Sequence, residues 1–210
     1  MNLKTFQVIE TKMGKEWGKS DYMEVARIHS TCIDLGFLPS LGDRFLALLY
    51  EAIDADENSI LILEKKKDEV IGFAAGGRSM KSIFRKMLSR LPRVVITLLP
   101  SVINPKQLWK IIELLFFGKK QKPNSSFPKA ELFSIAVIDS ARGSGLAQKL
   151  YYALAQRFFE EGEPAFCMVV GETLRPAHRF YQKMGAVPFA QISVHKGQYS
   201  TLYRQDLPIA

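Results

Sequence analysis

A short glycine loop, Arg142-Gly143-Ser144-Gly145-Leu146-Ala147, follows the apolar run 132–138 and opens a long amphipathic segment. Glycines let the backbone approach a ligand closely, and the first amides of a helix have no partners within the helix. The helix dipole adds partial positive charge at that end. Strand, loop and helix start together predict a cradle for a phosphate or pyrophosphate. An ordinary tight turn is the alternative interpretation.

The familiar phosphate-binding loops do not match this stretch. A dinucleotide-binding fingerprint that starts at Gly143 needs a glycine where the chain has Gln148, and the Gly-Lys pair of a Walker loop is missing here. The pattern Arg-x-x-Gly-x-Ala, made by Arg142, Gly145 and Ala147, resembles the acetyl-CoA loop of the GNAT superfamily of acyltransferases.

Residues 177–185 are similar to a second GNAT segment, Ala-x-x-x-Tyr-x-x-x-Gly, whose tyrosine lies beside the thioester sulfur. Tyr181 is the tyrosine of this segment. Two positions depart from the family pattern: Leu174 stands where Asn is frequent, and Ala186 stands where Phe usually follows the glycine. The resemblance covers residues 129–206 well and residues 4–78 weakly.

The resemblance implies an α/β fold of the GNAT type, a three-layer sandwich in which helices flank a mixed, mostly antiparallel twisted sheet. It also implies acetyl-CoA as cosubstrate. Tyr181 would protonate the departing thiolate, although a packing role in an amphipathic helix is the alternative. The expected cofactor contacts are the backbone of Ile135, Ala136 and Val137 along the pantetheine arm, and Arg142, Gly143, Ser144, Gly145, Leu146 and Ala147 around the pyrophosphate.

A carboxylate is the expected general base, because an amine attacks a thioester only when it is neutral. Glu131 stands at the head of the strand that leads to the loop, and this position resembles that of the base in histone-type GNAT members. A solvated carboxylate at a strand edge is the equal alternative, and Glu172 is the reserve candidate. A backbone amide of residues 135–137 is expected to stabilise the oxyanion.

The composition is that of a globular enzyme of modest size. The 210 residues suit a single domain, and 47% of them are hydrophobic. Cys32 and Cys167 are predicted to be reduced core thiols rather than a disulfide. The N-terminus has no uninterrupted apolar signal region, so the cytoplasm is the expected location. No metal site is expected, because the histidines have no metal-ligand spacing: His29, His178 and His195.

Hydrophobic periodicity and turn residues predict alternating strands and helices. The expected helices cover 21–36, 43–55, 146–161 and 173–184, the last with a cap at Thr173. A hairpin is expected from two of the strands, 59–64 and 70–75. The other expected strands are 6–10, 131–138, 165–170, 187–194 and 199–204, and the continuously apolar 165–170 is expected to be buried on both faces.

Residues 79–128 are predicted to form a basic amphipathic helical insertion in this single domain of residues 1–210. Between positions 79 and 122 there are ten Lys or Arg against one acid, a local net charge of +9, whereas the whole chain carries +8. A second helix is expected to start at Asn104 and Pro105. Apolar residues recur at helical spacing at the start of the segment: Met80, Ile83, Phe84, Met87, Leu88 and Leu91.

Three interpretations of the insertion stay open. Its apolar faces pack on the core and its charges are solvated, or its basic surface attracts an anionic acceptor such as a nucleotide-linked sugar. In the third, Trp109, Phe116 and Phe117 contact an anionic membrane surface, which would make the protein peripheral at the inner membrane face. Nucleic acid is not an expected partner, because no reader motif is visible.

The sequence therefore predicts an N-acetyltransferase that moves an acetyl group from acetyl-CoA to a primary amine of a small molecule by direct attack. An amino sugar or its nucleotide derivative is the first acceptor to consider. The alternative is a non-catalytic module that binds acyl-CoA in a regulatory or membrane-associated role. Acyl chain preference and oligomeric state stay open, an oligomer included.

Overall fold

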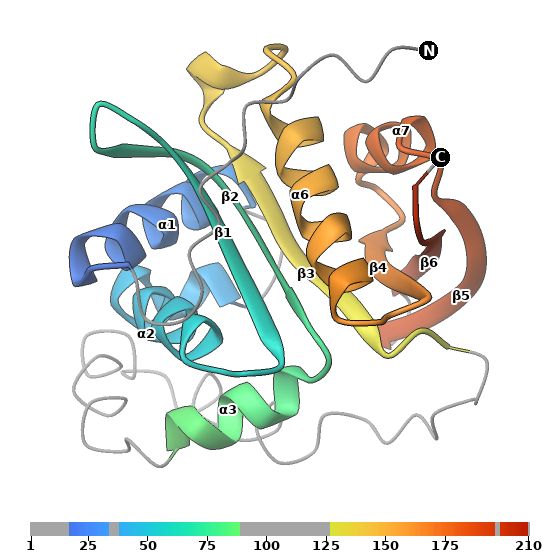
Figure 1. Cartoon of the computed structure of the whole chain (residues 1–210), viewed down its shortest axis with the longest axis horizontal. Coiled ribbons are helices and arrows are strands. Elements are labelled where there is room, and N and C mark those ends of the chain that lie inside the picture. Colours follow the sequence, from blue (N-terminus) through green and yellow to red (C-terminus); the bar gives the residue numbers. More distant parts are fainter. Residues whose placement is uncertain (1–16, 34–37, 89–126, 196–197, 210) are drawn as a thin grey trace.

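The computed structural model describes residues 17–33, 38–88, 127–195 and 198–209 of the chain. Six strands form one sheet in the order β1-β2-β3-β4-β6-β5 (Figure 1). Neighbouring strands run antiparallel except β3 and β4, which run parallel, so the predicted mixed sheet is confirmed. The strands are β1 (Ser59–Lys66), β2 (Glu69–Gly77), β3 (Ala130–Val137), β4 (Ala165–Gly171), β5 (Val187–His195) and β6 (Gln198–Asp206).

Helices cover both faces of this sheet, which gives the expected three layers. α1 and α2 lie behind the sheet in Figure 1, and α6 lies in front of it. Short 3-10 helices precede α2 (Leu38–Leu41) and follow β3 (Asp139–Ala141). The α-helices of the described residues are α1 (Lys19–Cys32), α2 (Asp43–Asp54), α3 (Met80–Leu88), α6 (Leu146–Glu160) and α7 (Arg175–Lys183). None of them is long and apolar enough to cross a bilayer.

Alternation along the strands builds two separate apolar cores, one on each face. In β1, Leu61 and Leu63 join the core under α1, α2 and α3. Ile60 and Ile62 join the core under α6 and α7. The predicted apolar face of α6 is confirmed, because each of its members is buried: Leu146, Leu150, Leu154 and Phe158.

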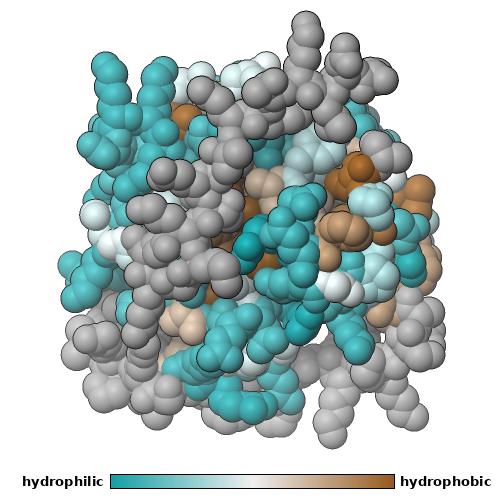
Figure 2. All heavy atoms as spheres, viewed as in Figure 1, coloured by the Kyte–Doolittle hydropathy of each residue, from teal (hydrophilic) through white to brown (hydrophobic). Residues whose placement is uncertain are grey.

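Local chemistry at the element ends corrects two sequence-based expectations and shows how the expected hairpin turns. Asp21 does not start α1; it lies in the first turn, where its Oδ2 accepts a hydrogen bond from the Gly18 amide at 3.0 Å. Leu174, rather than Thr173, is the N-cap of α7. The β1–β2 hairpin turns without glycine, because Lys67 and Asp68 both take the left-handed region with φ of 52° and 66°. Hydrophilic side chains project from this turn in Figure 2.

Only the start of the predicted insertion is described. α3 buries Ile83, Phe84 and Met87 against the core beneath α1 and α2, while Lys81 and Arg85 are exposed. In this stretch the apolar face packs on the domain, two of the charges are solvated, and the third, Lys86, forms an ion pair with the buried Asp56. The expected strand 6–10 and the expected helix from Asn104 lie outside the described residues.

The two ends of the connection that holds α3 lie side by side on the sheet. Gly77 at the end of β2 pairs with Glu131 at the start of β3. Next to Gly77, the Arg78 Nε donates to the buried Glu163 carboxylate at 2.5 Å, and its Nη1 donates to Asn58 at 3.3 Å. This contact ties the end of β2 to the turn between α6 and β4.

Two glycines of β2 let α6 lie close to the sheet. A Cβ on Gly72 would be 3.2 Å from Leu146 Cδ2, and a Cβ on Gly76 would be 2.8 Å from both Phe158 Cζ and the Glu131 carbonyl oxygen. β2 therefore presents no side chain to α6 at two positions, one near each end of the helix. Any side chain at position 76 must displace either α6 or the backbone of β3.

Gly76→Ala is expected to lower the free energy of unfolding by about 1–3 kcal/mol, because the added methyl group overpacks a contact with backbone. Chemical denaturation of the purified protein measures this loss. Gly171→Ala is the matched control, a strand glycine whose Cβ would be 3.6 Å from Leu174 Cδ1, an ordinary contact. Equal stabilities of the two variants would contradict the close approach of α6.

Candidate active site

The strands β3 and β4 pair only at their first residues. The parallel ladder holds two pairs, Ala130 with Phe166 and Glu131 with Cys167, and then stops. From residue 132 to the end of β3, no described strand pairs with the edge that faces β4. A central strand with an open edge has backbone N–H and C=O groups that remain available to a ligand.

A β-bulge lies near the start of the open part of β3. Ser134 pairs with Ala75 and Leu132 with Gly76, which leaves Phe133 as the extra residue. Beyond the bulge the Ile138 amide donates to the Ile71 carbonyl at 3.0 Å. By alternation the Ala136 amide also faces β2, and the amides of Ile135 and Val137 face the open edge. Two of the three amides predicted to meet a cofactor are thus directed outward.

One group on the open edge already has a protein partner. The Cys32 thiol at the end of α1 donates to the Val137 carbonyl oxygen at 3.4 Å. Cys32 is partly buried and Cys167 is buried, and both are free thiols, as predicted. The outward amides of Ile135 and Val137 can still donate hydrogen bonds to a ligand at this edge.

The glycine loop begins where β3 ends and turns into α6. Gly143 and Gly145 have φ of 76° and 87°, a conformation that only glycine adopts without strain. The Ser144 hydroxyl donates to the Ala141 carbonyl at 2.7 Å and accepts from the Leu146 amide at 3.3 Å. No described backbone carbonyl accepts from the amides of Gly143, Gly145 and Ala147, so these donors are free for an anion.

Charged side chains surround the loop. Arg142 is exposed and forms an ion pair with Asp139 at 2.9 Å. The Lys149 ammonium is 2.9 Å from Glu64 and lies beside a surface hollow of about 460 Å³. This hollow borders the N-terminus of α6 and is lined by Glu64, Ile71, Ser144, Gly145, Leu146, Gln148, Lys149 and Tyr152.

Glu131 lies at the point where β3 and β4 separate. Its neighbours Ala130 and Leu132 belong to the core under α6, so Glu131 points to the opposite face, toward α1 and α2. No described cation pairs with it, and burial raises the pKa of its carboxyl to about 7. Burial, followed by the nearby Glu131 charge, raises the pKa of Cys167 to about 12. A carboxyl group with this pKa can take up or release a proton near neutral pH.

Tyr181 lies on the other face of the sheet. It is a buried residue of α7, with ring centroids 6.1 Å from Tyr151 and 6.2 Å from Tyr203. Burial raises the pKa of its phenol, so the O–H keeps its proton at neutral pH. No described residue hydrogen-bonds this hydroxyl. Its proton is therefore available to a ligand.

The remaining candidates take other roles or lie apart. Glu172 is exposed just beyond β4. His178 Nε2 donates to the Gly171 carbonyl at 3.0 Å, and its Nδ1 is 2.8 Å from the Tyr203 hydroxyl, so it joins α7 to the sheet. Within the described residues no three His, Cys, Asp or Glu side chains are grouped to hold a metal ion.

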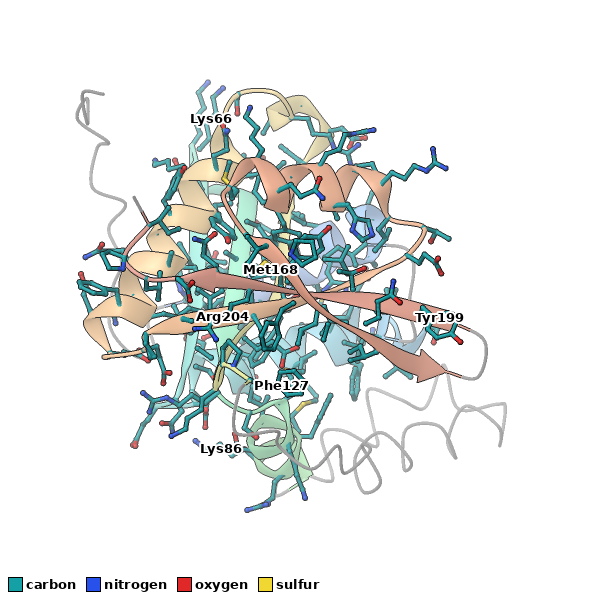
Figure 3. The ribbon with its side chains drawn as sticks, turned by 90° about the vertical axis from the view of Figure 1, so that its right-hand side faces the viewer. Lys66, Lys86, Phe127, Met168, Tyr199 and Arg204 are labelled. Carbon is teal, nitrogen blue, oxygen red and sulfur yellow. The ribbon has the colours of Figure 1, made fainter. Side chains whose placement is uncertain are left out.

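One face of the sheet is less covered than the apolar sequence of β4 predicts. Val169 was expected to be buried, but 41% of it is exposed. It lies on the same face as Glu131, where α1 packs against β2 and β3, and α2 packs against β1. Figure 3 shows Met168 on the α7 side of the sheet and Arg204 on the other side. Among the described residues, the α1–α2 face of β4 is therefore only partly covered.

Sequence reasoning missed three polar residues behind the bulge. His29, Tyr50 and Ser134 form a hydrogen-bonded chain from α1 through α2 to β3. The signal was Ser134, the only polar residue in the apolar run 132–138. His29 and Tyr50 gave no signal, because each is a single polar residue within an amphipathic helix.

Comparisons with known proteins agree with this architecture. A profile described as the acetyltransferase (GNAT) family matches residues 24–186. A search of curated proteins finds no match. The solved N-acetyltransferase of Staphylococcus aureus Mu50 is similar with 14% identity and a TM-score of 0.58, over 91% of this chain and 95% of that chain.

Two further solved structures share the fold. The ribosomal-protein-S18-alanine N-acetyltransferase of Escherichia coli has 11% identity and a TM-score of 0.55, over 93% of this chain and 94% of that chain. Ard1 of Thermoplasma volcanium has 16% identity and a TM-score of 0.55, over 91% and 95%. Since the family profile spans well over half of the residues, the chain belongs to the GNAT acetyltransferases, enzymes that take their acetyl group from acetyl-CoA.

Proposed function

We propose that this protein is an N-acetyltransferase that transfers an acetyl group from acetyl-CoA to a primary amine of a small molecule, by direct attack and without a covalent enzyme intermediate. The observation that carries the proposal is the separation of β3 from β4 immediately after Glu131. It places a carboxyl group with a pKa of about 7 at one end of an open strand edge and the glycine loop at the other.

The residues present suit acetyl-CoA along this edge. The free amides of Gly143, Gly145 and Ala147 would hold the pyrophosphate at the N-terminus of α6. A Cβ on Gly143 would meet nothing within 4 Å, so the loop leaves space for phosphate oxygens. The outward amides of Ile135 and Val137 would pair with the pantetheine arm as an added strand does. When bound, acetyl-CoA supplies the carbonyl that the amine attacks and the thiolate that leaves.

Two residues on opposite faces of the sheet divide the proton transfers. Glu131, in its ionised form, takes the proton of the attacking amine directly or through water on the α1–α2 face. Tyr181, which is protonated at neutral pH, gives its O–H proton to the departing thiolate on the α6–α7 face, and the phenolate then takes a proton from water. The outward amide of Ile135 or Val137 stabilises the oxyanion. The base and the acid therefore act on two different protons.

The charge of the chain favours an anionic acceptor. The segment 79–122 carries a net charge of +9, which would raise the local concentration of an anionic acceptor such as a nucleotide-linked amino sugar. One structural neighbour is named for acetylating a protein alanine. The test is therefore an acetyl-transfer assay with glucosamine, a nucleotide-linked amino sugar, spermidine and a peptide with a free N-terminal alanine. Transfer to none of them would contradict the proposal.

Gly145→Glu is expected to weaken acetyl-CoA binding at least about tenfold, because it sets a carboxylate among the phosphate-binding amides. Isothermal titration calorimetry measures the affinity. Gly162→Glu is the matched control, since Gly162 has φ of 80° at the other end of α6 and open space around it. Both variants carry the same charge and the same backbone strain. Equal affinities would place the cofactor elsewhere.

Glu131→Gln is expected to lower kcat by about 100-fold or more, because general base catalysis is lost. The wild-type kcat/KM should rise as pH increases through about 7, where Glu131 loses its proton, and this inflection should be absent from the variant. Glu163→Gln is the control, a buried carboxylate paired with Arg78. An unchanged inflection in Glu131→Gln would assign the base to another residue.

Tyr181→Phe is expected to lower kcat by about 100-fold while the affinity for acetyl-CoA is kept, because only the proton donor is removed. Tyr151→Phe is the control from the same aromatic cluster; its hydroxyl donates to Gln205 at 3.1 Å, and it should keep most of its turnover. Steady-state kinetics and calorimetry separate the two effects. Full activity of Tyr181→Phe would point to a packing role, and a chain that binds acetyl-CoA without any turnover would be a binding module.

A further inference from the structure

A buried polar chain runs through the core on the α1–α2 face and ends at the bulge of β3. His29 Nδ1 is 2.5 Å from the Tyr50 hydroxyl, and this hydroxyl is 2.9 Å from Ser134 Oγ. His29 is 4% exposed and Tyr50 is 1% exposed. Ser134 is only partly buried, so the chain connects the interior to the side of the strand from which an acceptor would approach.

Surrounding aromatic rings hold this chain in place. The Tyr50 ring meets Phe73 edge to face at 5.1 Å between centroids, and the His29 ring stacks on Phe73 at 6.4 Å. Burying three polar groups is costly unless their hydrogen bonds are made. Here each group finds its partner within the chain.

One assignment of donors and acceptors along this chain leaves Ser134 able to accept a hydrogen bond from a ligand. Burial lowers the pKa of His29 to about 4, so the imidazole is neutral at physiological pH and its unprotonated nitrogen is a strong acceptor. A phenol O–H is a good donor, and Tyr50 has one proton to give. If Tyr50 donates to His29 Nδ1, Ser134 must donate to the Tyr50 oxygen. The lone pairs of Ser134 Oγ are then left free.

The bulge sets the face of β3 on which the Ser134 side chain lies. Phe133 and Ser134 both contact the α1–α2 core although they are consecutive in the chain, because the bulge inserts one residue into the alternation. Glu131 points to the same face. The two positions are three residues apart, about 10 Å along an extended strand, so Ser134 and Glu131 are suited to different contacts of one acceptor.

Building on the proposed function, we propose that Ser134 binds the acceptor amine by accepting a hydrogen bond from its N–H, and that Tyr50 and His29 are positioning residues that fix the Ser134 hydroxyl in this orientation. The amine nitrogen then lies beside the open edge, and its proton reaches Glu131 through water. A site of this kind selects acceptors that carry N–H hydrogens.

The test measures amine binding to the protein saturated with CoA, which forms no product. The probes are glucosamine, spermidine and a peptide with a free N-terminal alanine, and the tightest of them is carried through the variants. Ser134→Ala is expected to weaken amine binding about tenfold, the loss of one well-made hydrogen bond. Tyr50→Phe is expected to weaken it about threefold, because Ser134 keeps its oxygen but loses its orientation.

The double variant and a matched control identify the mechanism. Tyr50→Phe combined with Ser134→Ala should bind the amine as Ser134→Ala does, because Tyr50 acts only through Ser134. Tyr22→Phe is the control: Tyr22 is also buried in this core, but its hydroxyl donates to Asp54 at 2.6 Å, away from β3. It should leave amine affinity unchanged.

The outcomes separate this inference from the proposed function. Wild-type amine affinity in Ser134→Ala, additive losses in the double variant, or no binding of any probe by the wild type would each overturn the role of Ser134. CoA affinity is measured alongside. A protein that binds CoA and amine as described but transfers no acetyl group would contradict the proposed function alone.

Discussion

The parallel pairing of β3 with β4 ends after two residue pairs, and the rest of the site depends on where it ends. Strands that stay paired offer no backbone groups to a ligand. Here α6 packs on β1, β2 and β3 and also contacts β4, while α1 packs on β2 and β3 from the other face. Because α6 spans both halves of the sheet, the strands can part beneath it without exposing the core that they share.

The bulge at Phe133 gives that open edge two chemically different sides. Before the bulge Glu131 faces α1 and α2, and after it Ser134 faces the same way despite the odd spacing. Tyr181 approaches from the α6–α7 side. A single irregular residue thus gathers two polar groups on one face of a strand, whereas regular alternation would send one of them into the opposite core. The cost is local: between Glu131 and Val137, only Phe133 lacks a partner in the β2–β3 ladder.

The features that the sequence predicted are those determined by interactions within a few residues. The glycine loop, the apolar face of α6 and the β1–β2 strands follow from positive-φ glycines and from periodicity within a few residues. The separation of β3 from β4 is not local, since it depends on helices packed from distant parts of the chain. The buried chain from His29 to Ser134 joins residues 105 positions apart, and only the single serine in the apolar run pointed to it. Val169 shows the same limit, because its exposure is set by which helices cover β4.

The long connection between β2 and β3 starts and ends at neighbouring positions of the sheet, because Gly77 pairs with Glu131. The sheet register and the Arg78 contact with Glu163 hold its two ends together. Because the entropic cost of closing a loop grows slowly with loop length, a long connection costs only a little more than a short one. A related protein could therefore have a longer, shorter or different connection and keep the same site. The basic segment lies within this connection, so its sequence can diverge while the sheet stays the same.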